Sequence, residues 1–206
     1  MNIPYVTFMK HAEKVTKGMS ASRPILKGVQ HNSDGSLVVT DSRRLYIANN
    51  GHTNESESVI NPKTGEEIDG NYPDVSRLTP LKCDAKFTTY INVKQMVDAL
   101  NVLLKANQVH DKKKTLTTLE VTDDKELVFI VSNYVIDTTY KTGSRITGDA
   151  QTITFNTKYL IEALQLFKDV GFEEVEFRSY GSERPFTLTA GKDDELLALI
   201  LPVRTV

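Results

Sequence analysis

The longest apolar stretch of the chain lies close to its C-terminus, where apolar residues run without a break from Leu196 to Leu201. Such a run predicts a strand that is buried on both faces, or a short buried helix. Pro202 favours the strand, because proline has no N–H to donate, and the strand must stop or become an edge strand there. The final segment, 203–206, carries two valines and one arginine, so it either packs on its own domain or lines a groove for another molecule.

The N-terminal region of the chain begins with a helical pattern over residues 5–19. Its apolar members recur at i, i+4, i+7 and i+11, which is typical of one helix face: Phe8, Ala12, Val15 and Met19. The opposite face has a basic stripe without an acidic residue, formed by Lys10, Lys14 and Lys17. Strands are predicted next over 25–30, 36–40 and 44–48, so the first unit is a helix followed by strands.

Residues 49–80 differ from the rest, because glycine and proline interrupt a polar stretch without helical periodicity. A structureless segment of this length is uncommon inside a compact domain. We interpret it as a linker, a long surface loop or the remnant of a lost element.

An internal repeat covers residues 86–206, in which segment 91–100 matches segment 155–164 in character at nearly every position. Asn92 and Asn156 are good N-caps for the two helices predicted over 93–105 and 157–169. Three strands are predicted after each helix: 116–121, 127–132 and 135–141, then 174–179, 186–190 and 196–201. A unit of one strand, one helix and three strands therefore occurs twice, and the start of the chain resembles a third, shortened copy.

The faces of the two repeated helices are expected to divide between core and solvent. The inward residues of the first are Met96, Leu100, Leu103 and Leu104. The outward polar faces are expected to lie exposed, side by side, and consist of Lys94, Asp98, Asn101, Lys105, Lys158, Glu162, Gln165 and Asp169.

Composition narrows the class of protein. The 206 residues carry a formal charge of −2, which argues against a purely electrostatic nucleic-acid binder but permits a local basic face. A single cysteine, Cys83, excludes a disulfide framework within one chain. Neither a signal peptide nor a membrane-spanning apolar run is visible, so we expect a cytoplasmic protein.

Catalytic chemistry is not expected. The four histidines are scattered and none has metal-ligand spacing to another ligand residue. Glycine-rich phosphate loops and nucleophile elbows are absent from the sequence. The acidic pairs fall in predicted turns or at strand ends, where solvated turns are the better interpretation. We therefore expect no enzyme, no metal and no cofactor.

Several segments resemble the bacterial β sliding clamps, the processivity subunits of DNA polymerase III. The specific ones are the tail from Leu199 to Thr205 and the link Asn71-Tyr72-Pro73-Asp74, supported by 22–28, 40–45, 77–80 and 155–160. The resemblance implies an α+β DNA-clamp fold, built from strand-helix-three-strand units with helices on one face of antiparallel sheets. It implies a truncated clamp domain over 1–80, with the irregular segment 49–80, and a complete domain over 81–206.

The resemblance also implies a hydrophobic groove that binds short peptides of DNA polymerase and other clamp-binding proteins. Carried over by matching position, the groove residues are Leu26, Thr40, Arg44, Leu45, Pro80, Leu199, Leu201, Pro202, Val203 and Arg204. Ser42 and Arg43 replace the usual Gly-His of the family, so the groove floor is expected to be more polar and more basic. The family's first domain and half of its middle domain have no counterpart.

Three functions compete, of which the third is a regulator that inserts into the ring of another clamp. The first is a sliding-clamp-like processivity factor that meets the phosphates of duplex DNA through Lys10, Lys14, Lys17, Lys94 and Lys105. The second is an adaptor or decoy that captures clamp-binding proteins without encircling DNA. We favour the processivity factor, and a phage or mobile-element origin would suit any of the three functions.

Self-association is expected, because the first unit lacks its partner unit and would leave a sheet edge and an apolar helix stripe uncovered. Tetramers are favoured over trimers or dimers, with Leu103 and Leu104 at a second contact. A monomer whose linker covers the exposed edge is the alternative.

Overall fold

The computed structural model describes residues 3–20, 22–109, 111–142, 145–149 and 151–204. Its α-helices are α1 (Tyr5–Thr16), α2 (Val93–Asn107) and α3 (Thr157–Val170), with 3-10 turns at η1 (Pro24–Lys27) and η2 (Lys82–Asp84). The strands are β1 (Val29–His31), β2 (Leu37–Thr40), β3 (Arg44–Ala48), β4 (Ser58–Ile60), β5 (Phe87–Asn92), β6 (Leu116–Val121), β7 (Leu127–Ser132), β8 (Asp137–Thr142), β9 (Thr147–Gly148), β10 (Thr152–Asn156), β11 (Glu174–Ser179), β12 (Phe186–Ala190) and β13 (Leu196–Ile200).

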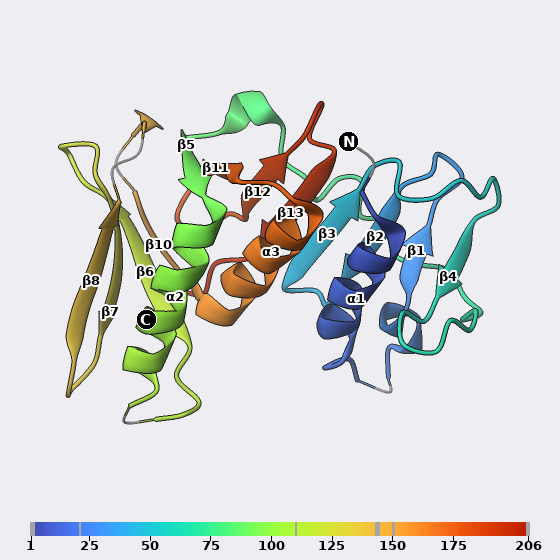
Figure 1. The fold of residues 1–206 in the computed structure, drawn as a ribbon, viewed down its shortest axis with the longest axis horizontal. Coiled ribbons are helices and arrows are strands. Elements are labelled where there is room, and N and C mark those ends of the chain that lie inside the picture. Colours follow the sequence, from blue (N-terminus) through green and yellow to red (C-terminus); the bar gives the residue numbers. More distant parts are fainter. Residues whose placement is uncertain (1–2, 21, 110, 143–144, 150, 205–206) are drawn as a thin grey trace.

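These elements form an α+β fold in which the three α-helices lie on one side of two antiparallel sheets (Figure 1). The larger sheet has the order β4-β1-β2-β3-β13-β12-β11-β5-β9, and the smaller has the order β10-β6-β7-β8. The two repeated units exchange their first strands, because β5 pairs with β11 of the second unit and β10 pairs with β6 of the first. This exchange joins the two units into one body.

The pairing of β3 with β13 joins the N-terminal segment, residues 1–80, to residues 81–206 within one sheet, with Leu199 opposite Leu45. All five residues of β13 are buried. Ala198 and Ile200 belong to the main core, while Leu197 and Leu199 belong to a second apolar cluster on the opposite face. Residues 196–200 of the apolar run therefore form a strand that is buried on both faces inside the larger sheet, and this strand ends two residues before Pro202.

Helix α1 packs its apolar stripe as predicted but ends three residues early. Phe8 and Ala12 are fully buried, and Val15 is 2% exposed. Because the helix ends at Thr16, Met19 lies in the following turn, where its N–H donates to the carbonyl of Thr16 at 3.0 Å.

The two repeated helices begin at the predicted caps. The side chain of Asn92 accepts the N–H of Gln95 at 3.0 Å, and that of Asn156 accepts the N–H of Lys158 at 3.0 Å. An N-cap side chain satisfies one of the backbone donors that the first helical turn leaves free. Both sequence-predicted caps are confirmed.

Two predicted strands begin more than one residue away from the expected position. Residues 25–30 divide into η1 and β1, because Pro24 at the start of a helical turn presets its backbone angle. The strand predicted over 135–141 begins at Asp137, since the side chain of Asn133 accepts the N–H groups of Val135 and Ile136 and extends the preceding turn.

A short stretch of the segment 49–80 is a strand, which corrects the view that it has no regular structure. Strand β4 pairs antiparallel with β1 and takes the place beside it that β5 takes beside β11. A Cβ on Gly28 would lie 2.3 Å from Cγ1 of Val59, so glycine permits this close approach. The first unit thus receives its missing edge strand from the chain's own linker.

The polar face of α3 is not simply exposed, contrary to the sequence expectation. Helix α1 lies beside α3, so Lys14 donates to Gln165 at 3.5 Å and the ring of His11 bonds Asp169 at 2.9 Å. Glu162 and Gln165 are half-buried as a result. Burial lowers the pKa of His11, although the hydrogen bond to Asp169 opposes that shift.

Candidate functional site

Two cavities open on either side of the tight turn between β2 and β3. The Asp41 carboxylate accepts the N–H groups of Arg43 and Arg44, both at 2.9 Å, and thereby fixes the turn. Ser42, between them, has a φ of 69°, and its N–H donates to the hydroxyl of Thr40 at 3.1 Å. Arg43 and Arg44 line both cavities.

The first cavity has a volume of about 280 Å³ and lies where β3 meets β13. Six of the groove residues expected from the family resemblance line it: Leu26, Thr40, Arg44, Leu45, Leu199 and Leu201. Positions far apart in the sequence are thus brought around one apolar hollow.

Four expected groove residues, Pro80, Pro202, Val203 and Arg204, do not line this cavity. The tail turns away from it. The N–H of Val203 donates to the carbonyl of Thr154 in β10 at 2.7 Å, while the exposed Arg204 lies 3.7 Å from Glu183.

The cavity-lining residues that are absent from the expected groove come mainly from the segment 49–80. The further lining residues are Ser42, Arg43, Pro73, Asp74, Val75, Leu78 and Pro185. Ser42 and Arg43 were noted as departures, and Pro73 and Asp74 belong to the recognised link. For Pro185 the sequence carries no signal, because only the pairing of β12 with β13 brings it to the cavity.

Tyr72 and Val75 hold this part of the segment 49–80 against the sheet. Tyr72 and Val75 pack on the apolar cluster of Val38, Leu45, Leu197 and Leu199. The hydroxyl of Tyr72 accepts the N–H of Thr40 at 3.0 Å, and burial raises the pKa of Tyr72 to about 12. This contact fixes one wall of the cavity.

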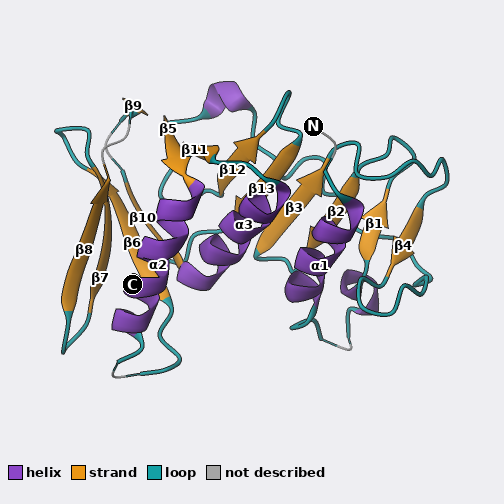
Figure 2. Cartoon of the chain, viewed as in Figure 1, coloured by secondary structure: helices purple, strands orange, loops and turns teal. Residues whose placement is uncertain are grey.

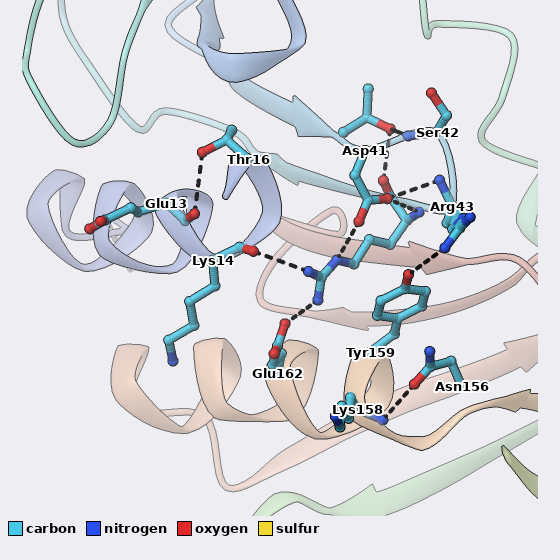
Figure 3. Close-up of polar contacts among 12 residues, drawn as sticks. Glu13, Lys14, Thr16, Asp41, Ser42, Arg43, Asn156, Lys158, Tyr159 and Glu162 are labelled. Carbon is cyan, nitrogen blue, oxygen red and sulfur yellow. Dashed lines mark hydrogen bonds and ion pairs between the residues drawn. The ribbon is translucent and has the colours of Figure 1, made fainter. Parts of the chain in front are cut away.

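Arg44 ties together the turn, α1 and α3, through its contacts with Asp41, Lys14 and Glu162, which are labelled in Figure 3. Its guanidinium bonds Asp41 Oδ2 at 3.0 Å, Glu162 of α3, and the carbonyl of Lys14 in α1 at 3.3 Å. It also lies over the ring of Tyr159, with 4.5 Å to the centroid. Only 5% of the Arg44 side chain is exposed, and the carboxylates of Asp41 and Glu162 neutralise its charge inside the protein.

The five lysines expected to face DNA are all exposed. Figure 2 shows the helices that carry them on one side of the sheets. Lys10 and Lys14 are in α1, with Lys17 directly after it, while Lys94 and Lys105 are in the first and last turns of α2. Two separate helices, with the residue directly after the first, therefore carry the predicted basic positions on the same side of the sheets.

Of the two expected self-association residues, Leu103 is buried and Leu104 reaches the surface in part. Leu103 is 2% exposed and belongs to the main core, and Leu104 is half-buried against it. Both pack within their own unit because α2 buries this side against its sheets. Leu103 is therefore a core residue, which corrects its expected place in a contact between chains.

Metal-binding and membrane-spanning features are absent from the described ranges. Their histidine, cysteine, aspartate and glutamate side chains form no group that could hold a metal ion. None of the described helices has the length and apolar character needed to cross a membrane.

No family model matches the chain. The beta sliding clamp of Streptococcus pneumoniae serotype 4 is 32% identical to it over 181 residues, 82% of this chain and 44% of that protein. The beta sliding clamp of Bacillus subtilis strain 168 is 30% identical over 145 residues, 67% of this chain and 35% of that protein. The chain spans less than half the length of these curated relatives.

Solved structures of sliding clamps have the same fold as this chain. The B. subtilis DNA polymerase sliding clamp superposes with a TM-score of 0.82 at 22% identity, covering 99% of this chain and 64% of that one. A Pseudomonas aeruginosa sliding clamp bound to griselimycin has a TM-score of 0.77 at 15% identity, covering 98% and 64%. The fold is thus a DNA-clamp fold. With the sequence matches, the chain belongs to the bacterial β sliding clamp family.

Proposed function

We propose that this chain is a clamp-like processivity factor, which contacts duplex DNA through its helical layer and tethers partner proteins through the 280 Å³ cavity. The observation that carries the proposal is the convergence of Leu26, Leu45 and Leu199 on one cavity beside β13. A clamp of the same fold binds griselimycin, which supports a ligand site on such a fold.

The proposed partner segment is a short peptide with a glutamine and two or three spaced leucine or phenylalanine anchors. Each well-buried anchor contributes roughly 1.5–3 kcal/mol. Ordering a free peptide offsets much of that gain, so a dissociation constant of about 1 μM is expected. Asp74 and Arg43 at the cavity supply polar partners for the glutamine and the peptide backbone.

Calorimetric titration of the protein with such a peptide tests whether the cavity is the binding site. Leu201→Asp should abolish binding, because Leu201 lines the cavity and is 39% exposed, so a charge there leaves the core intact. Leu81→Asp is the matched control, since Leu81 is 67% exposed and lies outside the cavity. Equal binding by both variants would refute the assignment.

Val203→Asp tests whether the peptide binds only in the cavity or also contacts the tail residues that the family resemblance places in the groove. Val203 is 37% exposed but does not line the cavity, so this variant should bind the peptide as the unaltered chain does. Loss of binding in Val203→Asp would show instead that the tail takes part in the groove.

DNA contact is proposed through phosphates, without base preference, by the five exposed lysines of α1, α2 and the residue after α1. Replacing Lys10, Lys14 and Lys17 together by glutamate should weaken binding to linear duplex DNA at low salt. The matched control replaces Lys63, Lys113 and Lys192, which are exposed outside the helices. An unchanged gel shift for the α1 variant would exclude this helix as the DNA face.

The adaptor alternative gains support from β4. The expectation of self-association rested on an uncovered sheet edge and an uncovered apolar stripe, but β4 pairs with β1 and the apolar stripe of α1 is buried. A light-scattering mass that stays at one chain up to high protein concentration would favour an adaptor. A mass of several chains, with rings in electron micrographs, would favour the encircling clamp.

A further inference from the structure

Two histidine rings lie against each other in the N-terminal segment. His31 ends β1 and is 2% exposed, while His52, in the loop between β3 and β4, is half-buried. Their ring centroids are 4.9 Å apart. His31 also contacts Tyr5, the first residue of α1, with 5.7 Å between the ring centroids. The histidine pair therefore connects α1, β1 and the loop that leads into β4.

His31 is bonded at both of its ring nitrogens. Its Nδ1 lies 3.0 Å from the carbonyl oxygen of Val29, which can only accept, so the proton of the neutral ring is on Nδ1. Its Nε2 then accepts the hydroxyl of Tyr5 at 3.1 Å. Burial lowers the pKa of His31 and the nearby His52 adds to that shift, although the bond to Val29 opposes it. These surroundings favour a neutral His31.

His52 is also bonded at both nitrogens, and its bonds require a neutral ring. Its Nε2 donates to the carbonyl of Ser36 at 3.2 Å, and its Nδ1 accepts the N–H of Asn54 at 3.2 Å. In a protonated ring, Nδ1 would carry a proton as well and could not accept from Asn54. A proton on His52 therefore breaks a contact that holds the loop, and it places a positive charge against the ring of His31.

Acidic groups face the pair from the turn before β2 and from the loop. Hydrogen bonds from Ser36 lower the pKa of Asp34, with a smaller contribution from the nearby His52. The loop adds two exposed carboxylates, Glu55 and Glu57. Asp34 reduces the cost of a charged His52 but does not remove it, because the bond from Asn54 is lost whichever carboxylate is near.

The loop that carries His52 leads into β4, which lies beside β1 (Figure 1). The N–H groups of Gly51 and His52 both donate to the carbonyl of Gly35, at 2.9 Å and 3.2 Å. Ser58, the first residue of β4, then pairs opposite His31 itself. The histidine pair thus lies at the point where β4 begins to cover the edge of β1.

We propose that His31 and His52 form a proton-sensitive latch, which favours the pairing of β4 with β1 while both rings are neutral and weakens it when they take up protons. Because burial lowers the pKa of His31 in the paired structure, the detached form binds the proton more readily, and acid shifts the balance toward detachment. Detachment uncovers the backbone groups of β1 that face β4. An uncovered strand edge is a template for pairing with another chain, so the latch controls access to that edge.

Hydrogen exchange of the peptide that covers β4, measured by mass spectrometry and corrected for the intrinsic exchange rate, tests the latch. A ring that binds its proton only after detachment lowers the protection by up to about tenfold between pH 7.5 and 5.5. With two such rings, the protection of β4 in the unaltered chain should fall by about 10- to 100-fold. In His52→Gln the fall should be about tenfold smaller than in the unaltered chain, because glutamine does not titrate.

The matched control is His11→Gln, because His11 is equally buried but bonds Asp169 of α3, away from the pair. This variant should show the same fall in β4 protection as the unaltered chain. An equal fall in His52→Gln and the unaltered chain would overturn the latch, as would a fall below about twofold in the unaltered chain. A fall reduced equally in His11→Gln and His52→Gln would overturn it too, because the exchange would then report global unfolding.

The ring tautomers give a second test that needs no variant. Nitrogen-15 NMR of the histidine rings at neutral pH should show the proton on Nδ1 of His31 and on Nε2 of His52. The opposite tautomer at either ring would contradict the bonding on which the latch depends.

Discussion

Arg44→Met tests whether Arg44 holds the N-terminal segment and α3 together. Methionine keeps much of the side-chain volume but removes the bonds to Asp41, to Glu162 and to the carbonyl of Lys14. The change therefore leaves two carboxylates and one carbonyl oxygen without their shared partner.

The expected loss in the free energy of unfolding follows from the burial of the three acceptor groups. Breaking a buried ion pair by removing one partner costs about 3–5 kcal/mol. Glu162 is 31% exposed and regains some water, while Asp41 still accepts two backbone N–H groups. We therefore expect the free energy of unfolding to fall by about 2–3 kcal/mol. For a chain of this size, that corresponds to a Tm lower by about 4–12 °C.

Urea denaturation followed by circular dichroism measures the effect. Arg43→Met is the matched control, since Arg43 is exposed and should change the free energy of unfolding by less than about 0.5 kcal/mol. Adding Glu162→Gln to Arg44→Met should recover some of the loss, because it removes an unpaired charge. A loss below about 0.5 kcal/mol in Arg44→Met would refute the reasoning.

Three further predictions concern stability. Burial lowers the pKa of His11 below 6.5, so the unfolded chain binds the proton more readily. The free energy of unfolding should therefore fall as the pH drops below about 6.5. Urea titrations at pH 7 and 5.5 should show a smaller fall of this free energy in His11→Gln than in the unaltered chain, and equal falls would contradict the prediction. Tyr72→Phe should cost about 1–2 kcal/mol in the same assay by orphaning the N–H of Thr40, whereas Tyr134→Phe, at a residue 96% exposed, should be neutral. Asn156→Ala should cost about 1 kcal/mol and Asn156→Ser little, and equal Tm values for the two would argue against the cap.

Local sequence signals predicted the elements well. The bounds of β3, β6, β7, β11 and β12 match the predicted ranges, because alternating or continuous apolar residues bounded by turn residues are visible without knowing any neighbour. Where a side chain or proline changed the local backbone, as at Pro24 and Asn133, the predicted bounds moved by a few residues. Such shifts depend on hydrogen bonds that periodicity does not contain.

The candidate site was only partly predictable. Matching to the family found the apolar groove residues of β3 and β13, because the turn before β3 and the tail after β13 have distinctive sequences. It also carried over Pro80, Pro202, Val203 and Arg204, which do not line the cavity. The sequence does not reveal that Arg23, Arg43 and Tyr159 line one cavity, because they meet only when α1, the turn and α3 are packed together.

The sequence by itself determined the helices, most strands, the two asparagine caps and the repeat, because these depend on residues a few positions apart. Only the tertiary structure decided how the strands pair. The exchange of β5 and β10, the junction of β3 with β13 and the capture of β4 by β1 all join distant segments. Any antiparallel strand with a buried face can pair with several others, and the choice is made by which pairing lets the helices and the linker cover both faces of the sheet.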